Sequence, residues 1–274
     1  MRAFISVDME GVAGVANGQD TAAGNPEYER ARRLMTAEAS ALVAGIFDVD
    51  SQARVTVADA HGSYRNLIPE ELDERATLSR GKPRTFAMMH GIDRGYDLAM
   101  LAGVHGRAGT GASVLSHTFT GALLDVRVNG ASLGELGLNA ALAGAYGVPV
   151  VLVAGDQSVA HEAREVLGNE VVAVTLKESF GHMAVESLHP AKARELLRAA
   201  ASEAVGKRGS VPPLRVESPV DVEVSLARPV FADLAELIEN VERVDGTTVH
   251  FVRPDVAGAY RVLRLIATLG TTSL

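Results

Sequence analysis

Acidic and imidazole side chains follow three short apolar runs of this sequence. They are Asp8 and Glu10 after residues 3–7, Asp59 and His61 after residues 54–58, and His105 after residues 98–102. Short apolar runs that stop at polar residues and glycine are typical of buried strands. In open parallel sheets, ligands bind just outside the carboxyl ends of the strands. If these strands are neighbours, we expect their imidazoles and carboxylates to meet in one pocket.

Asp8 and Glu10 are two residues apart, so in an extended chain their side chains share one face. Two carboxylates held near a buried sheet edge raise each other's pKa steeply unless a cation neutralises them. A divalent metal ion meets this need, and Asp, Glu and His ligands without sulfur suit Zn, Mn, Fe, Co or Ni better than Mg or Ca. About five candidate ligands are enough for two metal ions that share a carboxylate and activate a water between them.

Each candidate also has a plainer interpretation. Asp8 taken alone is typical of a turn or cap residue, and a lone His61 or His105 is typical of a loop histidine that bonds to the backbone. Glu135 stands in the first turn of an expected helix, where an acidic side chain interacts favourably with the helix dipole. The conjunction of three strand ends favours a metal site over these separate interpretations.

His117 follows a glycine-rich segment, residues 103–111, and is a candidate general acid or base or a stabiliser of a transition state. The alternative is a loop histidine bonded to the backbone. The order of the glycines matches neither the dinucleotide-binding motif nor the P-loop, so we expect a flexible loop that lets the backbone approach the site. Asp156 and Lys177 also follow expected strands and are secondary candidates for orienting substrate.

Helices and strands are expected to alternate along most of the chain. Apolar spacing and composition predict helices near residues 28–47, 133–146, 191–205 and 255–269, and further strands near residues 123–128, 148–153, 171–176, 220–226 and 247–252. Strands separated by helices form right-handed crossovers and a mostly parallel sheet. We therefore expect a three-layer α/β/α domain over residues 1–188, which carries the metal site, and a smaller α+β region over residues 189–274.

The composition restricts the partners. The 274 residues carry 26 Lys and Arg against 34 Asp and Glu, a net charge of −8 without a basic cluster, which argues against a nucleic-acid partner. Because no cysteine is present, any metal must be held by carboxylate, imidazole or carbonyl groups. No apolar run approaches the roughly 20 residues needed to cross a bilayer, and the acidic N-terminus lacks the apolar core of a signal peptide. We expect a cytoplasmic protein without membrane contact.

Five ordered motifs resemble the binuclear zinc D-aminopeptidase family associated with bacterial dipeptide-transport operons. They are residues 6–11 (SVDMEG), 58–61 (ADAH), 103–105 (GVH), 116–117 (SH) and 134–140 (GELGLNA). The resemblance covers at least residues 1–190 and continues more faintly to the C-terminus. It implies two zinc ions held by five ligands, Asp8 (bridging), Glu10, His61, His105 and Glu135. It also implies that His117 acts as nucleophile or as acid and base.

The resemblance also implies that the protein hydrolyses the first peptide bond of short peptides, preferentially after a D-residue as in D-Ala-D-Ala. It further implies a self-compartmentalising homo-oligomer, a ring-on-ring decamer. Residues 88–91 and 180–182 depart from the family pattern and are expected to line the substrate pocket. Two alternatives use the same ligand types. One is a two-metal phosphoesterase or other amidohydrolase, against which stands the absence of a basic cluster, and the other is a non-catalytic small-peptide-binding protein with a structural metal.

Overall fold

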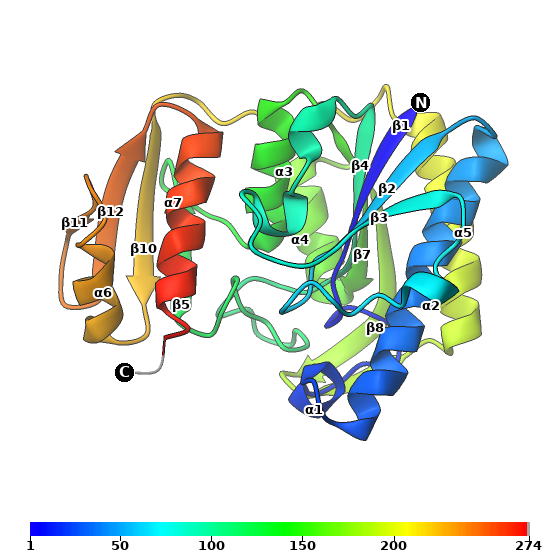
Figure 1. The fold of residues 1–274 in the computed structure, drawn as a ribbon, viewed down its shortest axis with the longest axis horizontal. Helices are drawn as coiled ribbons and strands as arrows, with labels where there is room; N and C mark the ends of the chain where they lie inside the picture. The colour runs from blue at the N-terminus through cyan, green and yellow to red at the C-terminus, as the bar shows by residue number, and fades with distance from the viewer. Residues whose placement is uncertain (273–274) are drawn as a thin grey trace.

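The computed structural model describes residues 1–272 and contains two sheets with helices packed around them (Figure 1). The larger sheet has seven strands in the order β3-β2-β1-β4-β7-β8-β9. These strands are β1 (Arg2–Val7), β2 (Arg54–Asp59), β3 (Ala76–Ser79), β4 (Leu98–Val104), β7 (Val150–Asp156), β8 (Val172–Gly181) and β9 (Ala184–Ser187). All neighbours pair in parallel except β8 and β9, which form an antiparallel hairpin.

Helices cover both faces of this sheet. The helices α2 (Pro26–Val49) and α5 (Pro190–Lys207) pack together over one face, and α3 (Glu135–Ala145) and α4 (Gln157–Leu167) lie over the other (Figure 1). Alternating residues of β1 serve the two layers, since Ile5 joins the core under α2 and α5 whereas Phe4 joins the core under α3. The expected three-layer architecture is confirmed.

Short elements complete the connections of this part of the chain. They are the helix α1 (Gly18–Thr21) and the 3₁₀ turns η1 (Pro69–Glu71), η2 (Ala87–Met89) and η3 (Ile92–Arg94). Pro190 occupies the first turn of α5, as expected for a residue that lacks a backbone N–H. Across residues 1–272, no helix combines the length and the apolar character that a membrane crossing requires.

The second sheet is antiparallel and has the order β11-β12-β10-β5-β6. It contains β5 (Leu123–Val128), β6 (Ala131–Ser132), β10 (Val220–Leu226), β11 (Glu242–Arg243) and β12 (Thr248–Arg253), with α6 (Pro229–Ala235) and α7 (Val256–Leu269) packed against it. No helix separates β4 from β5, so the chain leaves the parallel sheet there and β5 pairs with β10 instead. The division expected at residue 188 therefore does not separate the two sheets, and α5 packs with α2.

The register of the central strands brings the predicted strand ends to one edge. Val7 at the end of β1 pairs with Asp59 of β2 on one side and with Ala102 of β4 on the other. The loops that follow these three strands therefore begin side by side, at the edge of the sheet where ligands bind in parallel α/β folds. The expectation that the three strands are neighbours is confirmed.

The crossing of α2 and α5 depends on a close backbone approach at Gly45. Ser202 Oγ of α5 donates a hydrogen bond of 2.8 Å to the Gly45 carbonyl. A Cβ atom at position 45 would overlap the Arg198 carbonyl and press on Ala201. We expect Gly45→Ala to lower the free energy of unfolding by about 1–3 kcal/mol, although alanine is the better helix former.

Gly206→Ala, in the last turn of α5, is the matched control for this prediction. Open space surrounds position 206, so alanine there should leave the stability unchanged or raise it by up to about 1 kcal/mol. Urea unfolding of both variants measures the difference. Equal effects at the two positions would contradict the role of Gly45 in the crossing.

Candidate metal centre

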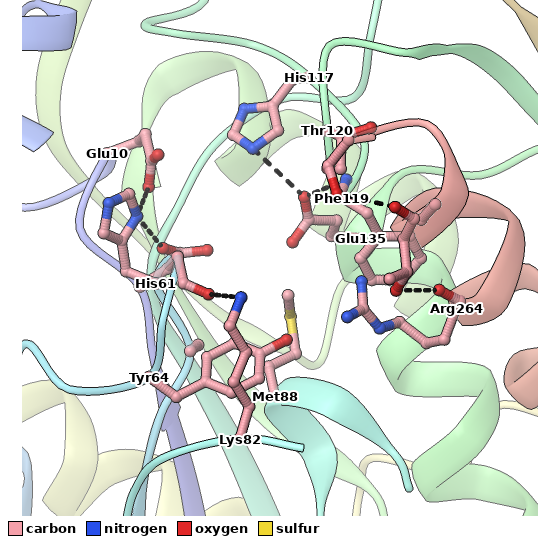
Figure 2. Close-up of a pocket in the computed structure, with 16 residues that line it drawn as sticks. Glu10, His61, Tyr64, Lys82, Met88, His117, Phe119, Thr120, Glu135 and Arg264 are labelled. Atoms are coloured by element: carbon pink, nitrogen blue, oxygen red, sulfur yellow. Dashed lines mark hydrogen bonds and ion pairs between the residues drawn. The ribbon is translucent and has the colours of Figure 1, made fainter. Parts of the chain in front are cut away.

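The six side chains predicted from the sequence lie together at the carboxyl ends of β2, β1 and β4. They are Asp8 and Glu10 after β1, His61 after β2, His105 and His117 after β4, and Glu135 at the start of α3. All except His105 line one pocket of about 250 Å³ (Figure 2). The side chain of His105 is only 1 % exposed and lies 3.7 Å from Glu135.

The ring of His61 is held between a backbone carbonyl and two carboxylates. Its Nε2 lies 2.9 Å from the carbonyl oxygen of Thr21, which can only accept, so Nε2 carries the hydrogen. Its Nδ1 lies 3.2 Å from Asp8 Oδ1 and 3.1 Å from Glu10 Oε2. A lone pair on Nδ1 would face two anions, so this position requires either a proton or a metal ion. A ligating histidine normally donates its other ring N–H in this way.

His105 and His117 repeat this arrangement. Their Nδ1 atoms donate to the carbonyls of Gly106 at 3.0 Å and Leu115 at 2.8 Å. Each Nε2 then lies 3.7 Å from Glu135 Oε1, and the two rings stack with centroids 4.1 Å apart. All three imidazoles therefore bond outward to carbonyls and present a free nitrogen to buried carboxylates.

The ligand atoms form two overlapping groups. Asp8, Glu10 and His105 make one, and His105, His117 and Glu135 make the other, with the ligand atoms of each group within 4.8 Å of one another. The position of Glu135 is fixed because its Oε1 accepts a hydrogen bond of 2.7 Å from the backbone N–H of Phe119. Buried carboxylate and imidazole donors without sulfur fit divalent metal ions of the zinc type.

The pKa values show that positive charge is needed here. Burial and the charge of Glu10 raise the pKa of Asp8 to about 7, and burial raises the pKa of Glu135. Burial by itself would also raise the pKa of Glu10, but the neighbouring imidazoles, above all His61, hold it well below its usual range. Burial opposes a charge on His61 as well, yet Glu10 and Asp8 raise its pKa well above the usual value. Burial thus disfavours the charge on Asp8 and Glu135, whereas imidazoles compensate the charge of Glu10, and a metal ion could supply the positive charge that the buried carboxylates lack.

Asp59, the last residue of β2, does not line the pocket, contrary to the expectation from its place at a strand end. Both of its oxygens accept hydrogen bonds from the next turn, from the backbone N–H groups of Asn66 at 2.6 Å and Leu67 at 2.7 Å and from the Asn66 side chain at 2.7 Å. Asn66 in turn donates to the carbonyl of His61 at 2.6 Å. Asp59 thus shapes the loop that carries His61.

The expectation that Lys177 orients substrate is wrong, because its side chain is buried away from the pocket. Its Nζ donates to three carbonyls of the loop after β1, those of Glu10, Val12 and Val15, at 2.6–2.7 Å. Three carbonyl acceptors match the three hydrogens of an ammonium group. Lys177 therefore fixes the loop that presents Asp8 and Glu10.

Asp156 is likewise a structural residue. One oxygen caps α4 at the N–H of Val159, and the other accepts from Ser113 Oγ at 2.9 Å, Val114 N–H at 2.8 Å and Ser179 Oγ at 3.0 Å. These bonds tie the glycine-rich loop to β7 and β8. The loop expected to be flexible is thus anchored at its far end, close to His117.

Several pocket residues carry no signal in the sequence. They are Tyr64, Lys82, Phe119, Thr120 and Arg264, the last from α7 of the second region (Figure 2). Met88 also lines the pocket, as expected for its segment. Residues 89–91 and 180–182 do not, so that expectation holds only for Met88. No local pattern marks such residues, because long-range packing brings them to the site.

The chain resembles known D-aminopeptidases over nearly its whole length. The family model described as D-aminopeptidase matches residues 1–265. The chain is 35 % identical over 270 residues to a D-aminopeptidase of Bacillus subtilis, an alignment that covers 98 % of this chain and 97 % of the relative. It also resembles the solved structure of the Zn-dependent D-aminopeptidase DppA from Bacillus subtilis, described as a self-compartmentalizing protease, with a TM-score of 0.96, 35 % identity and full coverage of both chains.

The buried acid Glu38 on α2 holds the loop after β1 and predicts a pH dependence of stability. Glu38 is only 2 % exposed, and its Oε1 accepts a hydrogen bond of 2.9 Å from the N–H of Ala13. Burial raises the pKa of Glu38 from 4.5 to about 7, against the opposing charges of Lys177 and Arg194. The folded state therefore binds this proton more tightly than the unfolded chain does. The stability that it contributes is fully present below about pH 4.5 and is lost as the pH rises through 7.

Glu38→Gln should remove this loss. We compare the free energy of unfolding of the variant with that of the unsubstituted protein at each pH. Between pH 4.5 and pH 8, we expect this difference to shift in favour of the variant by up to about 3 kcal/mol. Urea unfolding at the two pH values measures the difference, with Glu74→Gln at an exposed position as the control. A Glu38→Gln effect that is the same at both pH values would contradict the buried-acid explanation.

Proposed function

This chain belongs to the D-aminopeptidase family, and we propose that it removes the first residue from short peptides that begin with a D-amino acid, D-alanyl-D-alanine being the simplest. The observation that carries this proposal is the orientation of three imidazoles, each fixed by a carbonyl and each directing a free nitrogen at buried carboxylates. A metal-dependent hydrolase requires such a donor set.

We propose that two zinc ions occupy the centre. The ligands would be Asp8, Glu10, His61, His105 and Glu135. The similar Bacillus subtilis structure is described as Zn-dependent, and the donor types here suit the same metal. When bound, zinc polarises a peptide carbonyl and lowers the pKa of water to about 7.

His117 is the residue that we assign to proton transfer. Its side chain is 29 % exposed and lines the pocket, whereas His105 behind the same carboxylate is buried. The carbonyl of Leu115 fixes Nδ1–H, so Nε2 is the atom that can accept or deliver a proton. In peptide hydrolysis, the attacking water loses a proton and the leaving amine gains one, and Nε2 of His117 would accept the first and deliver the second.

We also propose that the chain works as a homo-oligomer. The similar Bacillus subtilis protein is described as a self-compartmentalizing protease, and the two chains match over their full lengths. A ring-on-ring decamer with the pockets facing an inner chamber would admit only small peptides. The small pocket is consistent with a short substrate.

A substrate screen tests this function directly. The zinc-loaded protein should release alanine from D-Ala-D-Ala much faster than from L-Ala-L-Ala and should leave p-nitrophenyl phosphate intact. Removal of metal by a chelator should abolish the activity, and zinc should restore it. Full activity in the metal-free protein, or hydrolysis of the phosphate ester alone, would overturn the proposal. Tight binding of the dipeptide without release of amino acid would favour a binding protein instead.

Substitution of a proposed ligand should remove metal and activity together. We expect Glu10→Ala and His105→Ala to lose bound zinc after dialysis and to lower kcat/KM by a factor of about 100 or more. Metal content per chain and hydrolysis of D-Ala-D-Ala measure the two effects. His161→Ala, an exposed histidine on α4, is the control and should retain both.

His117→Ala should separate metal binding from turnover. We expect the variant to keep its zinc, because five other donors remain, and to lose a factor of about 10²–10⁴ in kcat. Metal analysis and steady-state kinetics on the same preparation make the comparison. Loss of zinc from this variant would show that His117 is a ligand and would overturn its catalytic assignment.

A further inference from the structure

Arg264 lines the side of the pocket opposite His61 and Glu10 (Figure 2). It projects from α7 of the second region, and its guanidinium points into the pocket across from His61 and Glu10 (Figure 2). The guanidinium carbon lies 5.3 Å from the centre of the Phe119 ring. Within residues 1–272, its buried Nε has no hydrogen-bond partner. A buried donor without a partner is unusual and calls for an explanation such as a ligand.

The chemistry of this group selects a carboxylate ligand. Arginine presents a planar fork of N–H donors that matches a carboxylate in a bidentate way. The opposite side of the pocket holds the carboxylates of Asp8 and Glu10 beside His61, and Glu135 lies between them and Arg264 (Figure 2). The pocket therefore has an acidic metal-binding end and a cationic end, a polarity that matches a short peptide with a free amino group and a free carboxylate.

Rigid elements hold the distance between the two ends. One helical turn before Arg264, the hydroxyl of Tyr260 donates a hydrogen bond of 2.7 Å to Asn139 of α3, and Glu135 begins that same helix. Tyr260 also packs edge-on against Phe119, whose backbone N–H binds Glu135. The position of Arg264 relative to the proposed metal ligands is thus set by packing, as a fixed measure of substrate length requires.

Lys82 is the other cation that lines the pocket, but its contacts suit it less. It is exposed to solvent, and its Nζ already donates to the Gly62 carbonyl at 3.2 Å. An exposed ammonium contributes little to the binding of an anion, because water screens the charge. Arg264 is therefore the better candidate of the two.

We propose that Arg264 binds the C-terminal carboxylate of the substrate and so makes this protein selective for dipeptides with a free carboxylate. The inference rests on the proposed function, since it assigns the far end of the same peptide. Dipeptide amides lack this anion, and in longer peptides the carboxylate lies further from the scissile bond. Arg264 would act on specificity and not on the chemical step.

The test compares D-Ala-D-Ala with its C-terminal amide in Arg264→Met and in the unsubstituted protein. We expect the substitution to raise KM for the free dipeptide about ten- to hundredfold, with little change in kcat and little change in either constant for the amide. Arg261→Met is the matched control, since Arg261 lies one turn earlier on α7 and covers Phe86 outside the pocket. Arg261→Met should leave kcat and KM unchanged for both substrates.

A binding measurement supplies a second readout that does not depend on turnover. The measurement uses zinc-loaded His117→Ala protein. Calorimetry should show that the added Arg264→Met substitution weakens binding of the free dipeptide and leaves binding of the amide unchanged. Arg264→Lys should weaken binding of the free dipeptide less than Arg264→Met does. If Arg264→Met weakened binding of the free dipeptide and of the amide equally and lowered the melting temperature, Arg264 would only support Phe119, and the inference would be overturned. The inference would also be overturned if Lys82→Met, and not Arg264→Met, selectively weakened binding of the free dipeptide. Failure of the proposed function itself is distinct, because the unsubstituted protein would then hydrolyse neither compound.

Discussion

Carboxylates buried beside one another require compensating positive charge, and most features of this site provide for that charge. Asp8, Glu10 and Glu135 are each no more than 5 % exposed. Anions taken out of water at such close range are unfavourable unless cations or hydrogen-bond donors compensate them. The imidazoles cannot do so while neutral, because each commits its N–H to a carbonyl. A divalent cation satisfies the carboxylates and the imidazole lone pairs together.

The scaffold holds these groups in place by backbone contacts that leave little freedom. A side chain at Gly11 would overlap the Val104 carbonyl, and one at Gly103, whose φ is 64°, would overlap the Asp8 carbonyl. The loop after β1 is bonded directly to the end of β4 through the Gly11 N–H and the Gly103 carbonyl at 2.7 Å. Lys177 then anchors the other side of this loop. The donors therefore need little reorganisation on binding a ligand, which favours affinity and precise placement of substrate.

The second sheet completes the pocket instead of forming a separate unit. Its strand β5 begins just after the loop that carries His117, and its helix α7 packs against α3 (Figure 1). Arg264 of α7 enters the pocket across from His61 and Glu10 (Figure 2). One region thus supplies the proposed metal ligands, and the other supplies a cation to the same pocket. In the proposed function, this division would let one pocket bind both ends of a short peptide.

The sequence by itself determined the three-layer fold and the gathering of Asp8, Glu10, His61 and His105, because strand periodicity and the strand-end rule are local signals. It also pointed to His117, whereas Glu135 as a ligand came from family resemblance. Only the tertiary structure decided that β5 leaves the parallel sheet, that Lys177 binds a loop more than 160 residues away, and that Arg264 enters the pocket. Such contacts join distant parts of the chain and depend on packing between elements, which leaves no pattern in neighbouring residues.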